Sequence, residues 1–244
     1  MNTAVRPNRL RALALSAAAL VAATGIATGA AQAASYNLAD DFDSDAVVNG
    51  VWSYGTLDGL GAFQTFQSTV DAVGGVVGMN GHSDGNFHTI LKNESGGLTT
   101  HLGFLVPDAA VVFHPGQGGA LAIARFTAPE QGEYKVQGAF IGADPNGAMT
   151  SSAGAVVADG TAVFGGDVDG FLDSEIFSFS VFLAQNDTLD FTVGYGANAD
   201  FFFDSTFVLA SVDLAAVPVP AGGLLLLTGL GALGAMRRNK NRAA

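Results

Sequence analysis

The chain contains no cysteine, few charged residues and even fewer basic ones. Because none of its 244 residues is cysteine, a disulfide framework, a zinc knuckle, a Cys-ligated iron–sulfur cluster and a thiol nucleophile are all excluded. Lys and Arg number 10 against 22 Asp and Glu, so the formal charge is −12 and a nucleic-acid partner is disfavoured. Hydrophobic residues still make up 49%, which excludes a wholly disordered protein. The length suits one ordinary domain or two small ones.

The N-terminal segment has the pattern of an export signal. Arginines before residue 12 precede an apolar, alanine-rich run over 12–25, and Ala31 and Ala33 form an A-x-A cleavage site. The alternative is a transmembrane anchor, but small and polar residues break and follow the run. The sequence therefore predicts a secretory signal peptide over 1–33 and export through the Sec machinery.

The C-terminal segment 217–244 has three consecutive parts: a proline signature, an apolar run and a basic tail. As a helix, the apolar run 221–236 spans roughly 24 Å, less than the ~30 Å hydrocarbon core, so it crosses a membrane if the flanking arginines reach the interface. The tail is expected to stay cytoplasmic. The signature consists of Val217, Pro218, Val219, Pro220 and Ala221, and the tail contains Arg237, Arg238, Lys240 and Arg242.

Together these parts resemble the PEP-CTERM sorting signals of Gram-negative bacteria, most closely the VPLPA-CTERM variant, with Val219 at its leucine position. The resemblance implies recognition by an exosortase, which would cut near the signature and remove the helix and tail. It implies an inner-membrane-anchored intermediate followed by release to the cell surface or extracellular matrix. A C-terminal anchor that is never cut is the alternative.

The remaining region, 34–216, is strongly acidic and has the periodicity of strands. It holds all 22 acidic residues but only Lys92, Arg125 and Lys135, a formal charge of −19. Apolar residues alternate with polar ones, and glycine-rich turns separate the segments, so the region is expected to be one all-β, jelly-roll-like β-sandwich. The expected strands are 51–55, 60–67, 75–79, 87–91, 110–114, 120–127, 133–141, 161–164, 175–184, 187–195 and 207–214.

Short motifs in this region resemble a recurrent ectodomain of proteins that carry the same C-terminal signal. They are Asp40-Asp41-Phe42, Asn49-Gly50-Val51-Trp52-Ser53-Tyr54-Gly55, His114-Pro115-Gly116, the segment 124–134, the segment 186–194 and Phe203-Asp204-Ser205-Thr206. The resemblance implies a β-sandwich whose shape is similar to carbohydrate-binding modules, and it attaches no activity to the chain.

Calcium is the cation that the acidic residues suit, although the chain is expected to require no cofactor. Asp41 and Asp43 alternate as at the start of a calcium loop, but an EF-hand would need glycine and glutamate where Ala46 and Trp52 stand, so that motif is excluded. A loop site of another geometry stays open, with Asp41, Asp43 and Asp204 as candidate ligands. The alternative is a solvated acidic surface.

Two further features bear on ligand binding and catalysis. Trp52 and Tyr54 are candidates for stacking on sugar rings if they are exposed, while large strand aromatics more often belong to a core. Gly81-His82-Ser83-Asp84-Gly85 matches the G-x-S-x-G nucleophile elbow. That elbow needs a preceding strand and a following helix, and strand periodicity follows here, so the segment is interpreted as a polar loop.

The sequence thus predicts a non-enzymatic exported protein with a structural, adhesive or exopolysaccharide-binding role at the cell surface or in the matrix. Two alternatives remain. One is a polysaccharide lyase or hydrolase on the same fold, because paired carboxylates cannot be located from spacing alone. The other is a self-assembling surface protein without a ligand.

Overall fold

The computed structural model describes residues 34–72, 74–81, 87–101, 103–146, 151–216 and 229–233. Residues Ala33–Ala215 form one compact unit, close to the expected region 34–216. The predicted signal peptide, proline signature and basic tail lie outside the described residues. Within the described ranges there is no helix long and apolar enough to cross a membrane.

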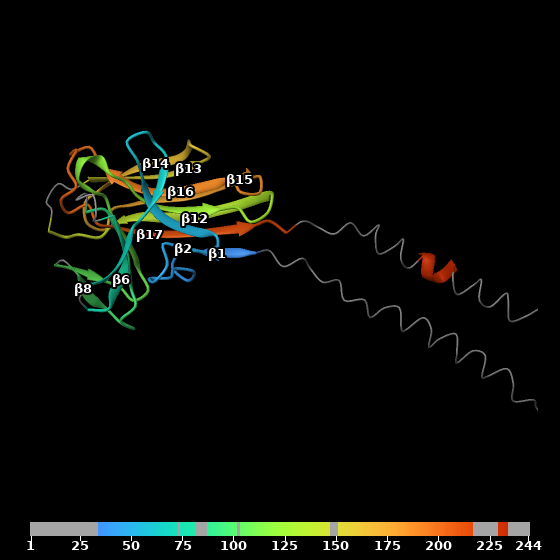
Figure 1. Cartoon of the computed structure of the whole chain (residues 1–244), viewed down its shortest axis with the longest axis horizontal. Coiled ribbons are helices and arrows are strands. Elements are labelled where there is room, and N and C mark those ends of the chain that lie inside the picture. Colours follow the sequence, from blue (N-terminus) through green and yellow to red (C-terminus); the bar gives the residue numbers. More distant parts are fainter. Residues whose placement is uncertain are drawn as a thin grey trace, which may run out of the picture. The chain divides into compact units, whose positions relative to one another are not determined.

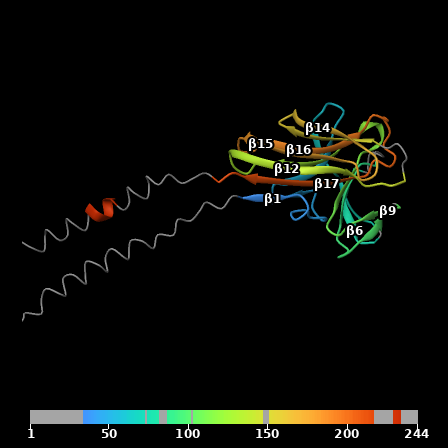
Figure 2. The same ribbon diagram turned by 180° about the vertical axis from the view of Figure 1, so that it is seen from behind.

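Two antiparallel sheets build the compact unit as an all-β sandwich (Figures 1 and 2). The first sheet has the order β15-β12-β17-β10-β7-β6-β5, with β1 also paired to β17, and the second has the order β14-β13-β16-β11-β3-β2, with β4 paired to β3. In the described part of this unit, the helical content is the 3-10 turn Gln117–Gly119. The first sheet comprises β1 (Ser35–Asn37), β5 (Ser68–Ala72), β6 (Val76–Asn80), β7 (Thr89–Asn93), β10 (Val111–His114), β12 (Gly132–Gly142), β15 (Ser174–Leu183) and β17 (Thr206–Leu214). The second comprises β2 (Val48–Asn49), β3 (Trp52–Leu57), β4 (Phe63–Thr65), β11 (Ala122–Thr127), β13 (Ser151–Ala158), β14 (Thr161–Asp169) and β16 (Thr188–Tyr195).

The alternating apolar residues explain why these segments form half-buried strands. In β15, Phe177 and Leu183 are buried, whereas Ser178 and Ser180 are exposed and Phe182 is 66% exposed. Successive strand side chains point to opposite faces, so the predicted alternation is confirmed here. The same pattern in β16 buries Leu189, Phe191 and Val193 between the sheets.

A chain of aromatic contacts joins the two inner faces. Trp52 contacts Phe126 and Phe191, with ring centroids 5.5 and 5.9 Å apart, and Phe191 in turn contacts Phe177 at 6.0 Å. Phe177 continues to Phe140 at 5.5 Å. Because Trp52, Phe126 and Phe191 come from the second sheet and Phe140 and Phe177 from the first, these rings pack the sheets together.

A separate hairpin, β8 (Thr99–His101) and β9 (Phe104–Val106), packs beside the first sheet (Figures 1 and 2). Phe104 and Val106 form a second buried cluster with Val112, against which Phe207 also packs. The residue following Val112, Phe113, belongs to the main core, so Val112 points to the opposite face of the sheet. The hairpin therefore covers part of the outer face of the first sheet.

The outer face of the second sheet carries a buried ion pair. Arg125 of β11 donates from Nε and Nη2 to the two carboxylate oxygens of Asp190 in β16, both at 2.7 Å. The guanidinium also lies 4.0 Å from the ring centroid of Phe63 in β4. Arg125 thus contacts both Asp190 of β16 and Phe63 of β4 across the outer face of this sheet.

The strand predictions were incomplete: one expected strand was misplaced, and the observed strands outside the expected ranges are β1, β2, β5, β8, β9 and β13. The expected strand 60–67 contains a loop tip, with Leu60 96% exposed, before the short strand β4. The strand β13 was not predicted, because its alanine and glycine residues give weak apolar alternation. Gly154 of β13 leaves room for an aromatic side chain, since a Cβ there would lie 2.5 Å from Cγ of Phe140.

Candidate functional site

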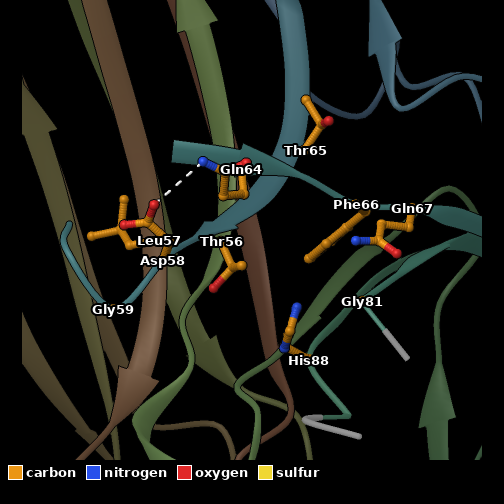
Figure 3. Close-up of a pocket in the computed structure, with 10 residues that line it drawn as sticks. All are labelled: Thr56, Leu57, Asp58, Gly59, Gln64, Thr65, Phe66, Gln67, Gly81 and His88. Carbon is orange, nitrogen blue, oxygen red and sulfur yellow. Dashed lines mark hydrogen bonds between the residues drawn. The ribbon is translucent and has the colours of Figure 1, made fainter. Parts of the chain in front are cut away.

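A pocket lies where the β3–β4 hairpin meets the connection between β6 and β7. Its volume is about 290 Å³. The lining residues that the structure describes are Thr56, Leu57, Asp58, Gly59, Gln64, Thr65, Phe66, Gln67, Gly81 and His88, drawn in Figure 3. Segment 82–86, which follows Gly81 and includes most of the G-x-S-x-G match, lies outside the described residues.

Asp58 shapes the rim of this pocket by organising the loop between β3 and β4. Its Oδ1 accepts backbone N–H bonds from Leu60 at 2.9 Å and Ala62 at 2.8 Å. These hydrogen bonds, from Ala62 first and Leu60 second, lower the pKa of Asp58. Gly61, at φ +84°, takes the left-handed conformation that closes the loop. Asp58 is therefore ionised at neutral pH and held in place by the backbone.

Phe66 and His88 form the buried side of the pocket. Their ring centroids are 5.1 Å apart and both side chains are buried. A Cβ at Gly81 would lie 1.8 Å from His88 Nε2, so only glycine at this position allows the imidazole its place. The pocket consequently has an aromatic and imidazole wall opposite its polar rim.

Two polar side chains of the lining have a long hydrogen bond or none among the described residues. Gln64 donates to Asp58 Oδ2 at a long 3.4 Å, and Thr56 Oγ1 is buried with no hydrogen-bond partner among the described residues. Figure 3 shows Thr56 between the Asp58–Gln64 pair and the Phe66–His88 pair. A buried hydroxyl without a partner costs about 1–3 kcal/mol, and a bound hydroxyl group would supply the missing partner.

The described lining holds a single carboxylate. Hydrolysis of a glycosidic bond ordinarily needs two carboxyl groups, one of them with a raised pKa. Asp58, with its lowered pKa, is poorly suited to act as the general acid. The described part of the pocket is arranged for hydrogen bonding.

Trp52 and Tyr54, the candidates for stacking on a sugar, belong to the core instead. Trp52 is 1% exposed and Tyr54 is fully buried, because both point inward from β3 into the aromatic core. A hollow of about 260 Å³, lined by Tyr36, Asp41 and Asn49 among others, reaches the edge of Trp52 but leaves no ring face exposed. Burial, and then the charges of Asp41 and Asp43, raise the pKa of Tyr54.

The three predicted calcium ligands do not come together. Asp41 Oδ2 accepts hydrogen bonds from the Asn37 N–H at 2.9 Å and from Trp52 Nε1 at 3.2 Å. Asp43 Oδ1 accepts the N–H of Asp45 at 2.9 Å. Both carboxylates therefore hold local structure, and Asp204 lies elsewhere, in the loop before β17. Across the described ranges, no three His, Cys, Asp or Glu side chains are grouped as metal ligands.

Sequence reasoning missed Thr56, Asp58 and Gln64 as site residues. The available signals were the Asp58-Gly59 turn and the polar residues alternating with aromatics in 63–67. Such patterns are common in surface hairpins. Only the approach of the β6–β7 connection, distant in sequence, turns this hairpin into a pocket.

No family model and no curated protein matches the chain. Among solved structures, it is similar to the CBM51 of a Clostridium perfringens GH95 protein, solved with methyl-galactose, at 16% identity and a TM-score of 0.37, covering 73% of this chain and 99% of that one. A family 35 carbohydrate-binding module from Clostridium thermocellum gives 14% identity, a TM-score of 0.27 and coverages of 49% and 87%.

A β-glucosidase from Kluyveromyces marxianus matches at 13% identity and a TM-score of 0.26; the match covers 43% of this chain and only 11% of the glucosidase. The structural neighbours thus include both carbohydrate-binding modules and a glycosidase. Likeness at these TM-scores is too weak to carry an argument about ligand or activity.

Proposed function

We propose that the chain is an exported, non-enzymatic protein with a jelly-roll-like β-sandwich that binds a neutral polysaccharide at the cell surface or in the extracellular matrix. The observation that carries this proposal is the polar pocket beside the β3–β4 hairpin. Binding there would give the protein an adhesive or structural role in the matrix.

The chemistry of the pocket supports a polyhydroxylated ligand. Sugar hydroxyls both donate and accept hydrogen bonds, and the lining offers a hydroxyl at Thr56, an amide at Gln64 and an ionised carboxylate at Asp58. Phe66 is 3% exposed, so its ring closes the apolar back of the pocket and the ligand contacts rest on the polar side chains. A volume of about 290 Å³ lies at the lower end of the ~300–1,000 Å³ of small-molecule pockets, which suits a short stretch of glycan.

Charge narrows the ligand class. The region 34–216 carries three basic and 22 acidic residues, so its field repels anionic polymers. The carboxylate of Asp58 adds a negative charge at the rim itself. A neutral glycan avoids this repulsion, whereas a uronic-acid polymer would meet it.

Pocket variants test the binding proposal. Thr56→Val keeps the side-chain shape but removes the buried hydroxyl, so it is expected to weaken retention of the full chain on the producing organism's exopolysaccharide at least 10-fold, without loss of stability. Gln64→Ala is expected to weaken retention similarly. Affinity electrophoresis measures retention, and thermal melting measures stability.

Matched controls and product analysis make this test decisive. Thr161→Val and Gln137→Ala change exposed residues of β14 and β12 and should bind as the unaltered protein does. Loss of binding in the controls but not in the pocket variants would refute the assignment of the site. Depolymerisation of the glycan would instead favour the lyase or hydrolase, and self-association without retention would favour the surface-assembly alternative.

For localisation, we propose sorting by an exosortase after Sec export, with transient anchoring in the inner membrane. The support is the order of signature, apolar run and basic tail in 217–244. Mass spectrometry of the surface fraction is expected to recover peptides of the sandwich but none from 222–236. Recovery of these C-terminal peptides from released protein would show that the signal is not cut.

A further inference from the structure

Strand β15 forms an open edge of the first sheet. It is ten residues long, Ser174–Leu183, and stands at the end of the strand order, with β12 as its one strand partner among the described residues (Figure 2). Its register with β12 is unbroken from Ser174 to Leu183. The other side of an edge strand offers a row of N–H and C=O groups to a further strand.

The remaining sheet edges are shorter, charged or irregular. β5 has five residues and includes Asp71, while β2 has two residues and β4 has three. The pairing of β14 with β13 shifts register between Val156 and Val157. Such features discourage one sheet from pairing with another. β15 has no lysine, no proline and a single charged residue, Glu175, near one end.

Apolar side chains are left uncovered on both faces of β15. On the outer face, Ile176 is 74% exposed and Phe182 is 66% exposed, with the exposed Ser178 between them. On the inner face, Phe179 and Val181 are only half-buried where they pack against the core. A neighbouring strand would cover apolar surface on both faces, which is favourable.

We infer that β15 pairs antiparallel with β15 of a second copy of the chain, about a twofold axis at Phe179. In this register Ile176 lies opposite Phe182 of the second copy, and the symmetry repeats the contact. Directly opposite residues of antiparallel strands share a face and contact each other. A shift of two residues either way sets Phe182 opposite a serine, and a shift of one residue opposes inner with outer faces. The strand is therefore complementary to itself, as a twofold interface requires.

The charges near the edge permit this approach. The region 34–216 has 22 acidic and three basic residues, so two copies repel each other over most orientations. In the inferred register Glu175 lies opposite Leu183, and the two copies of Glu175 are at opposite ends of the interface. One strand further in, Glu133 and Lys135 of β12 are both exposed and carry opposite charges. The edge thus brings the copies together without opposing like charges.

The size of the interface sets its strength. Ten residues a side are fewer than the ~20–30 of a standard interface, so a weak dimer with a Kd of roughly 10–100 µM is expected. Each copy carries its own β3–β4 pocket, so the dimer presents two. Two pockets on one particle strengthen attachment to a repetitive glycan; that consequence rests on the proposed function, whereas the pairing does not.

Sedimentation velocity of the full chain over roughly 5–500 µM, a range that brackets the expected Kd, tests the pairing. The mass should rise from monomer to dimer. Ile176→Lys and Phe182→Lys change exposed side chains, so Tm should stay the same while dimerisation weakens at least about 10-fold. Leu209→Lys is the matched control, because Leu209 is 50% exposed in β17, which has strands on both sides. A monomer throughout, or equal weakening by Leu209→Lys, would overturn the inference.

Single cysteines test the register, since the chain has none of its own. Ser178 and the Ser180 of a second copy lie opposite each other in the inferred register, within disulfide range. An equal mixture of Ser178→Cys and Ser180→Cys, treated with oxidised glutathione, should give covalent dimers on non-reducing electrophoresis. Each variant alone should give far fewer, because its cysteines would be diagonal neighbours about 7–8 Å apart.

The crosslinking and binding results separate this inference from the proposed function. Equal or greater crosslinking of either variant alone, or no crosslinking in the mixture, would refute the twofold pairing at Phe179. A protein that stays monomeric but is retained on the exopolysaccharide would overturn the pairing and leave the proposed function intact. A dimer with the predicted crosslink but no retention would support the pairing and count against glycan binding.

Discussion

Replacing Arg125 with methionine is expected to destabilise the protein by about 3 kcal/mol, because it leaves a buried negative charge without its partner. The side chain of Asp190 is 8% exposed and receives both of its short hydrogen bonds from Arg125. The Arg125 side chain is 24% exposed, which places the effect at the lower end for buried pairs. Urea denaturation at neutral pH measures the change in free energy of unfolding.

A control and a double variant separate the charge effect from lost packing. Lys92 and Glu94 form a looser pair at 3.7 Å, with Glu94 39% exposed, so Lys92→Met should cost no more than about 1 kcal/mol. Combining Arg125→Met with Asp190→Leu removes the unpaired charge and should recover part of the loss. If Arg125→Met and Lys92→Met lowered the free energy of unfolding equally, the Arg125–Asp190 pair would not have the stabilising role assigned to it.

The free energy of unfolding is expected to fall as pH rises from about 4 to 7, by roughly 2–4 kcal/mol from Asp204 alone. Burial raises the pKa of Asp204 to about 7, above the ~3.9 of an unfolded aspartate. Between these values the folded state binds more protons than the unfolded state, so stability is greatest at the acidic end and is lost as pH increases.

Denaturation of the unaltered protein and of Asp204→Asn, at a series of pH values from 4.5 to 8, isolates this contribution. Other titrating groups are common to both proteins, so the difference between the two curves reports on Asp204. Asp204→Asn should become the more stable protein as pH approaches 7.5. Asp108→Asn, a change at an exposed turn residue, should run parallel to the unaltered protein. A pH-independent difference for Asp204→Asn would contradict the raised pKa.

Much of the sandwich was predictable because burial between two sheets requires period-two alternation. Segments 175–184 and 187–195 carry large apolar residues at every second position, and the structure places the strands β15 and β16 there. β13 escaped prediction for a complementary reason. Its inner positions include the small residues Ser152 and Gly154, and the space over Gly154 is filled by Phe140 of β12 in the facing sheet, so the large apolar residue at this point belongs to another segment of the sequence.

The candidate sites were less predictable than the fold. Trp52 and Tyr54 are aromatic residues of the kind that stack on sugars. The alternation of residues along a strand does not show which of its faces packs against the other sheet. Asp41 and Asp43 have a calcium-like spacing, yet nearby N–H groups occupy Asp41 Oδ2 and Asp43 Oδ1. The sequence named Asp204 only as one candidate ligand among several acidic residues. Its burial, which raises its pKa, is visible only in the structure.

The sequence by itself determined the distribution of charge, the all-β class and the order of the expected targeting segments at the two ends. These are properties of composition and of local periodicity, so each can be recognised within a short segment. Which aromatics became core, which hairpin borders a pocket and which carboxylate was buried depended on the packing of the two sheets. Each of these depends on contacts between residues distant in the chain, such as Phe66 with His88 and Asp204 with Ser152, and those contacts exist only once the sheets pack.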